Sequence, residues 1–250
     1  MKFGFIGFGN LGRAAASGLV MSGSAGNSDI SVCETSSDAR AVAEGAPYYA
    51  YVSADVNEIL VRSDVVFLVV KGYVFDKLAA EINRAYLTEK TVVSFMAGES
   101  FEKIYSLIGQ VDLVRVMPSL QISVCDGVIG YTKAPPELAE IFDKLGFAFE
   151  TEPENIEKVM AFASCGLGFA AYLIDAFKAA GETMGFSPET ASRIAALTFK
   201  NACDRGDFHN TVKAVATPGG ATEQGVIHMD KNNVFDIVSQ AVRSAYDRMT

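Results

Sequence analysis

The chain is poor in the residues that build metal centres and disulfide frameworks. Its four cysteines, Cys33, Cys125, Cys165 and Cys203, lie far apart, and its 250 residues include two histidines and no tryptophan. A zinc knuckle or a disulfide scaffold needs paired or closely spaced cysteines, so neither is expected. Unpaired cysteines fit a reducing compartment, and we predict a cytoplasmic protein without a metal site.

The sequence also lacks clustered positive charge and a membrane-length apolar run. The formal net charge is -9 and the pI is about 4.8, whereas nucleic-acid binding needs concentrated positive charge. The longest uncharged run, residues 159–174, is shorter than the ~20 residues that span a bilayer. It predicts a buried core helix. The N-terminus has no signal-peptide pattern, so we expect small-molecule partners, with no nucleic acid and no membrane.

Apolar residues, in contrast, make up half of the chain, which is enough for a sizeable core. In the first 150 residues, short β-branched or aromatic runs alternate with amphipathic stretches. Strands that alternate with helices indicate βαβ units and a mainly parallel sheet. The runs that predict strands are KFGFIGF, DISVCE, DVVFLVV, KTVVSFMAG, DLVRVMP, DGVIGYT and, more weakly, GFAFET.

From about Pro153 onward the pattern is helical. Gly185 predicts the end of one helix, and Ser187 with Pro188 predicts the start of the next, which should run to about Asp204. The last helix carries a stripe of apolar residues that must be buried. Since few helices follow the sheet, burial against a second subunit is the favoured hypothesis. The stripe consists of Val234, Ile237, Val238, Ala241, Val242 and Ala245.

A glycine motif of GxGxxG spacing follows the first predicted strand and precedes an alanine-rich helix, an order typical of dinucleotide binding. Its first glycine allows a tight turn, its second leaves room for pyrophosphate, and its third allows close helix packing. Backbone N–H groups at the helix start then hold the negative charge. The predicted cofactor loop is Gly7, Phe8, Gly9, Asn10, Leu11 and Gly12.

These patterns predict an α/β fold with two domains. Residues 1–152 form a Rossmann-type doubly wound sheet that binds the dinucleotide, and residues 153–250 form an all-helical dimerisation and substrate domain.

Glu34 bears on the choice of cofactor. It follows the second strand, 22 residues after Gly12, where an acid commonly binds the adenosine ribose hydroxyls. Its charge would repel a 2′-phosphate, and Thr35 rather than an arginine comes next, which favours NADH over NADPH. Arg40, however, is close enough in sequence to reach such a phosphate.

Two further strand ends are expected at the cofactor edge of the sheet. The strand at 64–70 ends at Val70, and Lys71, which follows at the carboxyl edge of the sheet, either lines the nicotinamide ribose pocket or is an exposed strand-end lysine. Met117 and Pro118 end another strand, at a position that would face the cofactor in the usual strand order.

The few candidate acids and bases limit the chemistry. A nicotinamide implies hydride transfer, and alcohol oxidation would also need a positioned acid or base. His209 lies in a polar turn and His228 suits packing in a helix, so neither is a strong candidate. Imine reduction needs less, because solvent can protonate a ring imine, and orientation becomes the main task.

The segment ATPGGATEQG, residues 216–225, is a candidate anion-binding loop. Its Pro-Gly-Gly run breaks the helix, Gly219 and Gly220 have no Cβ to block a ligand, and a new helix follows. Backbone N–H groups could hold a substrate carboxylate there. Taken alone, a plain interhelical turn is equally consistent with these residues.

Together these motifs resemble the pyrroline-5-carboxylate reductase family over nearly the whole chain. IGFGNLGRA is similar to the family's cofactor loop, VVK to its sheet-edge segment, VVSFMAGES to its next strand and turn, RVMP to the segment near the nicotinamide, and ATPGGATEQG to its substrate loop. The resemblance implies reduction of pyrroline-5-carboxylate to proline by NAD(P)H, in a homodimer that binds the substrate between its domains across the subunit interface. Rings of dimers also occur in the family.

The resemblance also implies roles for residues of the 217–222 loop. Thr222 would be the hydrogen-bond partner of the ring nitrogen, and thus the catalytic candidate. The residues expected to hold the substrate are Thr217, Gly219, Gly220, Ala221 and Thr222.

Three departures from the family pattern leave the substrate open. Residues 119–121 read Ser-Leu-Gln rather than Asn-Thr-Pro, which removes an amide near the nicotinamide. Residues 163–169 read Ala-Ser-Cys-Gly-Leu-Gly-Phe rather than Ser-Gly-Ser-Gly-Pro-Ala-Tyr, and a proline expected near Phe208 is absent.

Two alternatives therefore remain. One is a related imine or hydroxy-acid oxidoreductase with a different substrate, although Tyr172 stands where hydroxy-acid enzymes place a lysine. The other is a nucleotide-binding protein with little catalysis.

Overall fold

The computed structural model describes residues 1–46 and 51–249. They form two compact units, the first made of residues 1–46, 51–164 and 246–249 and the second of Cys165–Ala245. The first contains the sheet, and the described residues of the second are helical or in connecting turns. The helical segment 153–164 belongs to the first unit by its contacts, so the domain boundary after residue 152 stays a prediction.

The first unit is built around one eight-stranded sheet. Its strands are β1 Phe3–Ile6, β2 Ile30–Cys33, β3 Tyr51–Ser53, β4 Val65–Leu68, β5 Thr91–Ser94, β6 Asp112–Pro118, β7 Gly127–Tyr131 and β8 Gly146–Glu150. They lie in the order β3-β2-β1-β4-β5-β6-β7-β8. Neighbouring strands are parallel except β6 and β7, which pair antiparallel.

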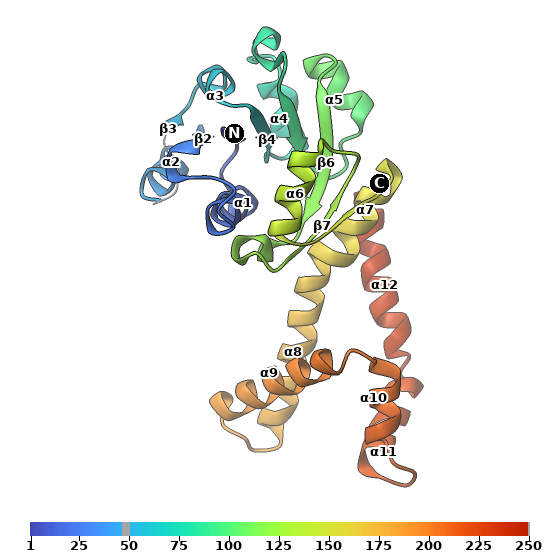
Figure 1. Ribbon diagram of the computed structural model, residues 1–250. Coiled ribbons are helices and arrows are strands. Elements are labelled where there is room, and N and C mark those ends of the chain that lie inside the picture. The colour runs from blue at the N-terminus through green and yellow to red at the C-terminus, as the bar shows by residue number, and fades with distance from the viewer. Residues whose placement is uncertain (47–50, 250) are drawn as a thin grey trace. The chain divides into compact units, whose positions relative to one another are not determined.

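Helices connect these strands and cover the sheet (Figure 1). The α-helices are α1 Asn10–Met21, α2 Ser37–Glu44, α3 Val56–Arg62, α4 Gly72–Leu78, α5 Phe101–Ile108, α6 Pro136–Lys144 and α7 Ile156–Val159. The 3-10 helices are η1 Asn27–Asp29, η2 Arg84–Leu87, η3 Leu120–Val124 and η4 Pro153–Asn155, and a π-helical turn, η5, spans Met160–Ser164.

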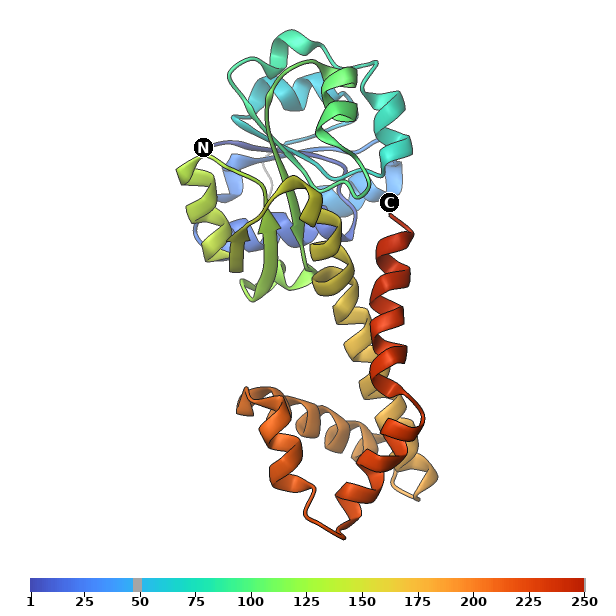
Figure 2. The same ribbon diagram turned by 90° about the vertical axis from the view of Figure 1, so that its right-hand side faces the viewer.

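The central strands are apolar on both faces because helices cover both. Side chains alternate across a strand, so Phe5 and Phe67 stack at 4.8 Å on the face covered by α1 and α6. Ile6 and Leu68 point into the other cluster, with α3, α4 and α5. Figure 2 shows the strands between helices on both sides. The predicted mainly parallel, doubly wound sheet is confirmed.

The strand predictions differ from the structure in two details. All seven predicted strands are present, but β3 was not predicted, since its three residues at the sheet edge are half-buried and show no apolar alternation. In addition, β4 ends at Leu68 rather than at Val70. Val69 still donates its N–H to the Ile6 carbonyl, but Val70 has left the ladder.

The second unit consists of helices, and residues with known capping preferences mark where some of them begin and end. They are α8 Cys165–Thr183, α9 Pro188–Arg205, α10 Phe208–Val215, α11 Ala221–Lys231 and α12 Val234–Asp247, of which the residues from Tyr246 onward are grouped with the first unit. Gly185 has φ +95° after α8, and the Ser187 hydroxyl accepts the Thr190 N–H at 3.2 Å. α9 crosses α8, with the Phe177 and Phe199 rings 5.8 Å apart.

The prediction that 159–174 is one buried core helix is wrong on both points. The segment contains the end of α7, the π-helical turn η5 and the start of α8, and Phe162 and Tyr172 are 74% and 76% exposed. The physical reason is that none of the described residues forms a second layer over the outer faces of this segment. The helical run Pro153–Thr183 is long and apolar enough to cross a membrane, with 11% of its most apolar window buried, which alone is weak evidence for a span.

Candidate functional site

The glycine loop between β1 and α1 has the conformation that its motif requires. Gly7 has φ +94°, where a Cβ would lie 2.8 Å from the Val69 carbonyl oxygen. A Cβ on Gly12 would lie 2.7 Å from the Gly7 oxygen. A side chain at Gly7 would therefore press against the segment that follows β4, and one at Gly12 would push α1 away from the end of β1.

The start of α1 is open. Gly9 is the N-cap residue, no side chain caps the helix, and a Cβ on Gly9 would meet no atom within 4 Å. Asn10 is exposed and Leu11 is half-buried, while the Phe8 ring is buried in the core. The first-turn N–H groups of a 12-residue helix thus stand beside an uncovered backbone, an arrangement that fits a pyrophosphate.

Glu34 is tied to this loop. Its carboxylate accepts the Phe8 N–H at 3.1 Å and the Ser36 N–H at 3.2 Å. The Arg40 guanidinium donates instead to the backbone carbonyls of Glu34 and Thr35, at 3.3 and 2.9 Å. The acid is held at the end of β2 beside the glycine loop, while the nearest arginine already has backbone partners.

The sheet register brings the other predicted strand ends to the same edge. Ile6, Leu68, Ser94 and Arg115 are paired across β1, β4, β5 and β6. Because the four strands are parallel, the segments that follow them lie along one edge. The strand order reverses direction between β1 and β4, and ligands of doubly wound sheets bind at such a point.

Lys71 and Val70 lie at this edge, after β4. Lys71 is exposed and is the N-cap residue of α4, without a side-chain cap hydrogen bond. The Val70 side chain comes within 2.8 Å of where a Gly7 Cβ would be. The Val70 side chain is therefore next to the glycine loop, and Lys71 follows it in the chain.

Met117 and Pro118 are the last two residues of β6, and they make different contacts. Met117 is 2% exposed and packs with Ile156 and Val159. The Pro118 carbonyl accepts the Ser164 hydroxyl at 2.9 Å. Ser119, where the family pattern has an amide, donates its N–H to the Val128 carbonyl, and its hydroxyl accepts the Val128 N–H, both at 2.9 Å, so it serves the β6–β7 pairing.

The loop at 217–222 forms a tight turn in the second unit. Gly219 has φ +73°, and its N–H donates to the Glu223 carboxylate at 2.7 Å. Gly220 is the N-cap residue of the 11-residue α11 and donates its N–H to the Thr217 carbonyl at 2.8 Å. Thr217, Ala221 and Thr222 are exposed. The Gly219 N–H thus already has a carboxylate partner from the chain itself, and the hydroxyl-bearing residues on either side of the glycines are open to solvent.

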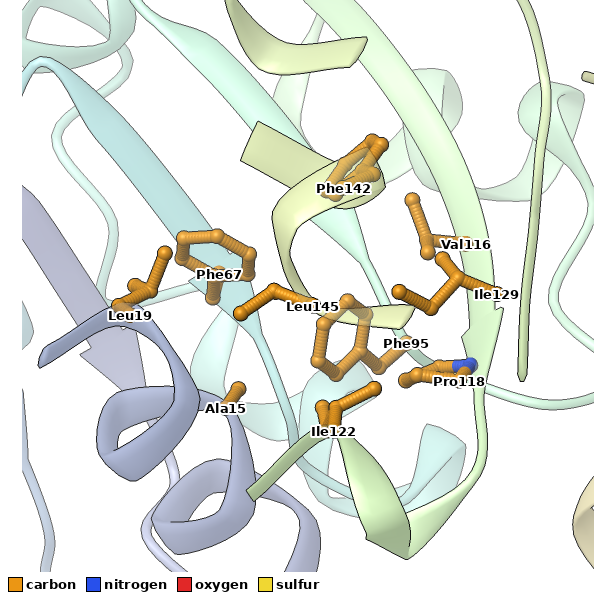
Figure 3. Close-up of a pocket in the computed structure, with 10 residues that line it drawn as sticks. All are labelled: Ala15, Leu19, Phe67, Phe95, Val116, Pro118, Ile122, Ile129, Phe142 and Leu145. Atoms are coloured by element: carbon orange, nitrogen blue, oxygen red, sulfur yellow. The ribbon is translucent and has the colours of Figure 1, made fainter. Parts of the chain in front are cut away.

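The apolar hollow in the first unit is not the site. Figure 3 shows it inside the core, between α1, the sheet and α6. Its free space is about 10 Å³, which is at most the room for one water molecule. Its lining residues are Ala15, Leu19, Phe67, Phe95, Val116, Pro118, Ile122, Ile129, Phe142 and Leu145.

Both histidines belong to helices of the second unit. His209 is in the first turn of α10 rather than in a polar turn, and His228 is exposed on α11. Within residues 1–46 and 51–249, no three His, Cys, Asp or Glu side chains are grouped to hold a metal ion.

Sequence reasoning missed a buried ion pair at the cofactor edge. Arg115, 3% exposed, contacts the Glu157 carboxylate at 2.6 Å and the Met96 carbonyl at 3.2 Å. A single charged residue inside the apolar run DLVRVMP was the sequence feature that could have indicated this pair. Its partner Glu157, 42 residues away, has no feature in the sequence that distinguishes it from other acidic residues.

Two family models match this chain. Residues 153–250 match the model described as pyrroline-5-carboxylate reductase dimerisation, and residues 2–98 match NADP oxidoreductase coenzyme F420-dependent.

Known proteins match nearly the whole chain. The pyrroline-5-carboxylate reductase of Aquifex aeolicus is 29% identical over 97% of this chain and 94% of its own, and pyrroline-5-carboxylate reductase 2 of Bacillus subtilis is 26% identical over 99% and 93%. The crystal structure of the Plasmodium falciparum enzyme with NADP bound has the same fold, with a TM-score of 0.90 at 22% identity over 100% of this chain and 97% of that one.

Proposed function

This chain belongs to the pyrroline-5-carboxylate reductase family, and from this we infer that it reduces the C=N bond of pyrroline-5-carboxylate to form proline, with a hydride from NAD(P)H. The observation that carries the inference is the match of curated reductases over almost the full length of the chain, together with a family model that covers all of its helical part.

The residues at the sheet edge fit a dinucleotide. The uncapped start of α1 offers N–H groups, and Gly9 leaves the backbone open to a pyrophosphate. When bound, the reduced nicotinamide supplies a hydride to the imine carbon, and solvent supplies the proton on the ring nitrogen. The task of the protein is to orient the two reactants and to hold the substrate anion.

The proposal includes a moderate preference for NADH over NADPH. It is supported by the Glu34 carboxylate, held beside Phe8 where a 2′-phosphate would meet its charge, and by the engagement of Arg40 with backbone carbonyls. The relative from Plasmodium falciparum has NADP bound, so the preference rests on this chain's own residues.

The proposal also places the substrate carboxylate at the 217–222 loop. Support comes from the exposed threonine hydroxyls, from the start of α11 and from the carboxylate of Glu223, which the Gly219 N–H already binds. A substrate carboxylate there would compete with Glu223 or displace it. The Thr222 hydroxyl would bond the ring nitrogen and hold the imine for attack.

The enzyme is a homodimer through its helical domain. The apolar faces that the single chain leaves exposed supply the surface for this contact. Rings of dimers stay a prediction. The proposed cytoplasmic location is supported by four cysteines that are all free thiols.

The test is turnover by the purified protein with NADH or NADPH and pyrroline-5-carboxylate. We expect loss of nicotinamide absorbance that depends on the imino acid, and proline as the product. Tight cofactor binding without turnover of any cyclic imino acid would instead identify a nucleotide-binding protein. Oxidation of 3-hydroxy acids would identify an alcohol-type oxidoreductase.

A further inference from the structure

The Arg115–Glu157 pair lies where the first unit meets its own helical extension. Arg115 is on β6, and Glu157 is on α7, just before the π-helical turn η5. The pair is largely buried, with side-chain exposures of 4% and 13%. One guanidinium nitrogen, Nη2, makes the contacts to both Glu157 and Met96, while Nε has no hydrogen-bond partner among the described residues.

A buried ion pair contributes little net free energy to the stability of a fold. Removing two charges from water costs several kcal/mol per ion, and apolar side chains of similar size often replace buried pairs without loss of stability. The strand neighbours of Arg115, Val114 and Val116, are apolar and fully packed. A specific positional role would explain a guanidinium here better than stability does.

What the guanidinium holds is the loop after β5. Met96 follows that strand, and its carbonyl accepts from Arg115. Ala97 packs against the cluster of Met117, Ile156 and Val159. The Ser164 hydroxyl adds a second tie, to the Pro118 carbonyl. The segments after β5 and at the end of β6 are thus fixed to one another and to α7.

We propose that Arg115 is a positioning residue for hydride transfer: held by Glu157, it fixes the Met96 carbonyl and the end of β6, and so sets the seat of the nicotinamide half of the cofactor. The proposal rests on the proposed function. It does not involve the adenosine half, because the glycine loop and Glu34 follow β1 and β2, and β4 and β5 separate those strands from β6.

The experiment compares Arg115→Met, Arg115→Lys and Glu157→Gln with the unchanged protein, well below each unfolding temperature. Arg115→Met should lower kcat by on the order of tenfold or more, because small displacements of reacting groups are costly. The isotope effect with NADH deuterated at the transferred position should rise. Affinity for ADP-ribose, which lacks the nicotinamide, should stay within about twofold. Arg115→Lys, which keeps a charged donor, should recover part of kcat.

Lys2→Met is the matched control, since it breaks the Lys2–Asp29 ion pair, also 2.6 Å long, at the opposite end of β1. It should leave kcat and the isotope effect unchanged. If Arg115→Met does not fold, Glu157→Gln is the deciding variant, because it keeps an oxygen acceptor and removes only the charge.

The fluorescence of bound NADH reports on the nicotinamide without turnover. If the unchanged protein reduces no imino acid, the proposed function fails, yet a fluorescence change in Arg115→Met with intact ADP-ribose binding would still support the positioning role. Unchanged kcat, isotope effect and fluorescence in both Arg115→Met and Glu157→Gln would overturn it. So would an equal loss of affinity for the nicotinamide-free fragment.

Discussion

Glu34, which we propose influences the choice of cofactor, also binds the backbone of the glycine loop. Its carboxylate is 26 residues from Phe8 in sequence, yet it accepts the Phe8 N–H. The position after the second strand could be predicted from the sequence by counting from Gly12. The hydrogen bond could not, because it depends on β1 and β2 lying side by side.

Glu34→Gln should shift cofactor use toward NADPH. The amide oxygen can still accept the Phe8 N–H, so the loop should keep its shape, but the charge that opposes a 2′-phosphate is lost. We expect the NADPH-to-NADH ratio of kcat/KM to rise about tenfold, equivalent to about 1.4 kcal/mol. An unchanged ratio would remove Glu34 from this role.

Thr222→Val should impair the imino acid step. The change keeps the side-chain shape and removes the hydroxyl, and a lost hydrogen bond to a charged group costs about 1.5–3 kcal/mol. The expected fall in kcat/KM for pyrroline-5-carboxylate is therefore about ten- to a hundredfold, with KM for the cofactor unchanged. Thr222→Ser, which restores the hydroxyl, should recover most of the activity, and full activity of the valine variant would contradict the assignment.

Cys33 should be chemically inert in the folded protein. It is 3% exposed, and burial, followed by the nearby charges of Glu34 and Asp55, raises the pKa of its thiol to about 12. The thiolate is the reactive form, so iodoacetamide near neutral pH should label the exposed Cys203 first. Mass spectrometry of peptides would show this order, and equal labelling rates would contradict it.

Because the pKa of Cys33 is raised in the folded protein, the stability of the protein should fall at alkaline pH. The thiol has its ordinary pKa of 9.0 in the unfolded chain and a pKa of about 12 in the folded protein. The folded state therefore binds more protons between these values, and the contribution of Cys33 to stability falls as the pH rises through that window.

At the scale of single elements, two glycines of the β1–α1 turn are expected to have different roles: one is needed for stability and the other for cofactor binding. Gly9→Ala and Gly12→Ala make the same chemical change three residues apart. A Cβ on Gly9 meets nothing, whereas one on Gly12 meets the Gly7 carbonyl oxygen at 2.7 Å. Only the second change therefore requires the helix to move.

Gly12→Ala should destabilise the protein by about 1–3 kcal/mol through this overpacking, which lowers Tm by about 2–4 °C per kcal/mol. Gly9→Ala should change stability by less than about 1 kcal/mol, yet weaken cofactor binding by about tenfold or more, because its methyl occupies the space for the pyrophosphate. Thermal melts and cofactor titrations decide both, and normal affinity of Gly9→Ala would argue against the predicted pyrophosphate site.

An element could be predicted from the sequence when residues next to it in the chain determine it. The central strands and the caps at Gly185 and Ser187 follow from nearby residues, and they were predicted. β3 was missed because three half-buried residues at a sheet edge carry no alternation. The burial of 159–174 was predicted wrongly because the pattern shows that a face is apolar, not which molecule covers it.

At the scale of the whole molecule, the single chain is an incomplete fold. In the second unit, the described buried residues are Ala191 and Ala195, and none lies in α8, α10, α11 or α12. Ile237, on the predicted stripe of α12, is 59% exposed. Surface of this kind is stable in water only when a partner covers it, and the dimerisation domain identifies that partner as a second copy.

Ile237→Glu should therefore weaken the dimer. A charge placed in an apolar contact costs several kcal/mol when it is unpaired, so the dissociation constant should rise by about a hundredfold or more. Light scattering over a range of concentrations measures it. Ser239→Glu, about 200° around the same helix, is the matched control and should leave the dimer intact, and a dimer unaffected by Ile237→Glu would exclude the stripe from the interface.

The sequence by itself determined the parallel sheet, the glycine loop, the position of Glu34 and the turn at Pro218–Gly220, because strand periodicity, glycine conformation and helix caps are local properties. Only the tertiary structure decided which strand ends share an edge, that Phe8 binds Glu34, and that Arg115 joins Met96 to Glu157. These contacts connect residues distant along the chain, and their partners are set by sheet order and helix packing, which a single sequence does not record.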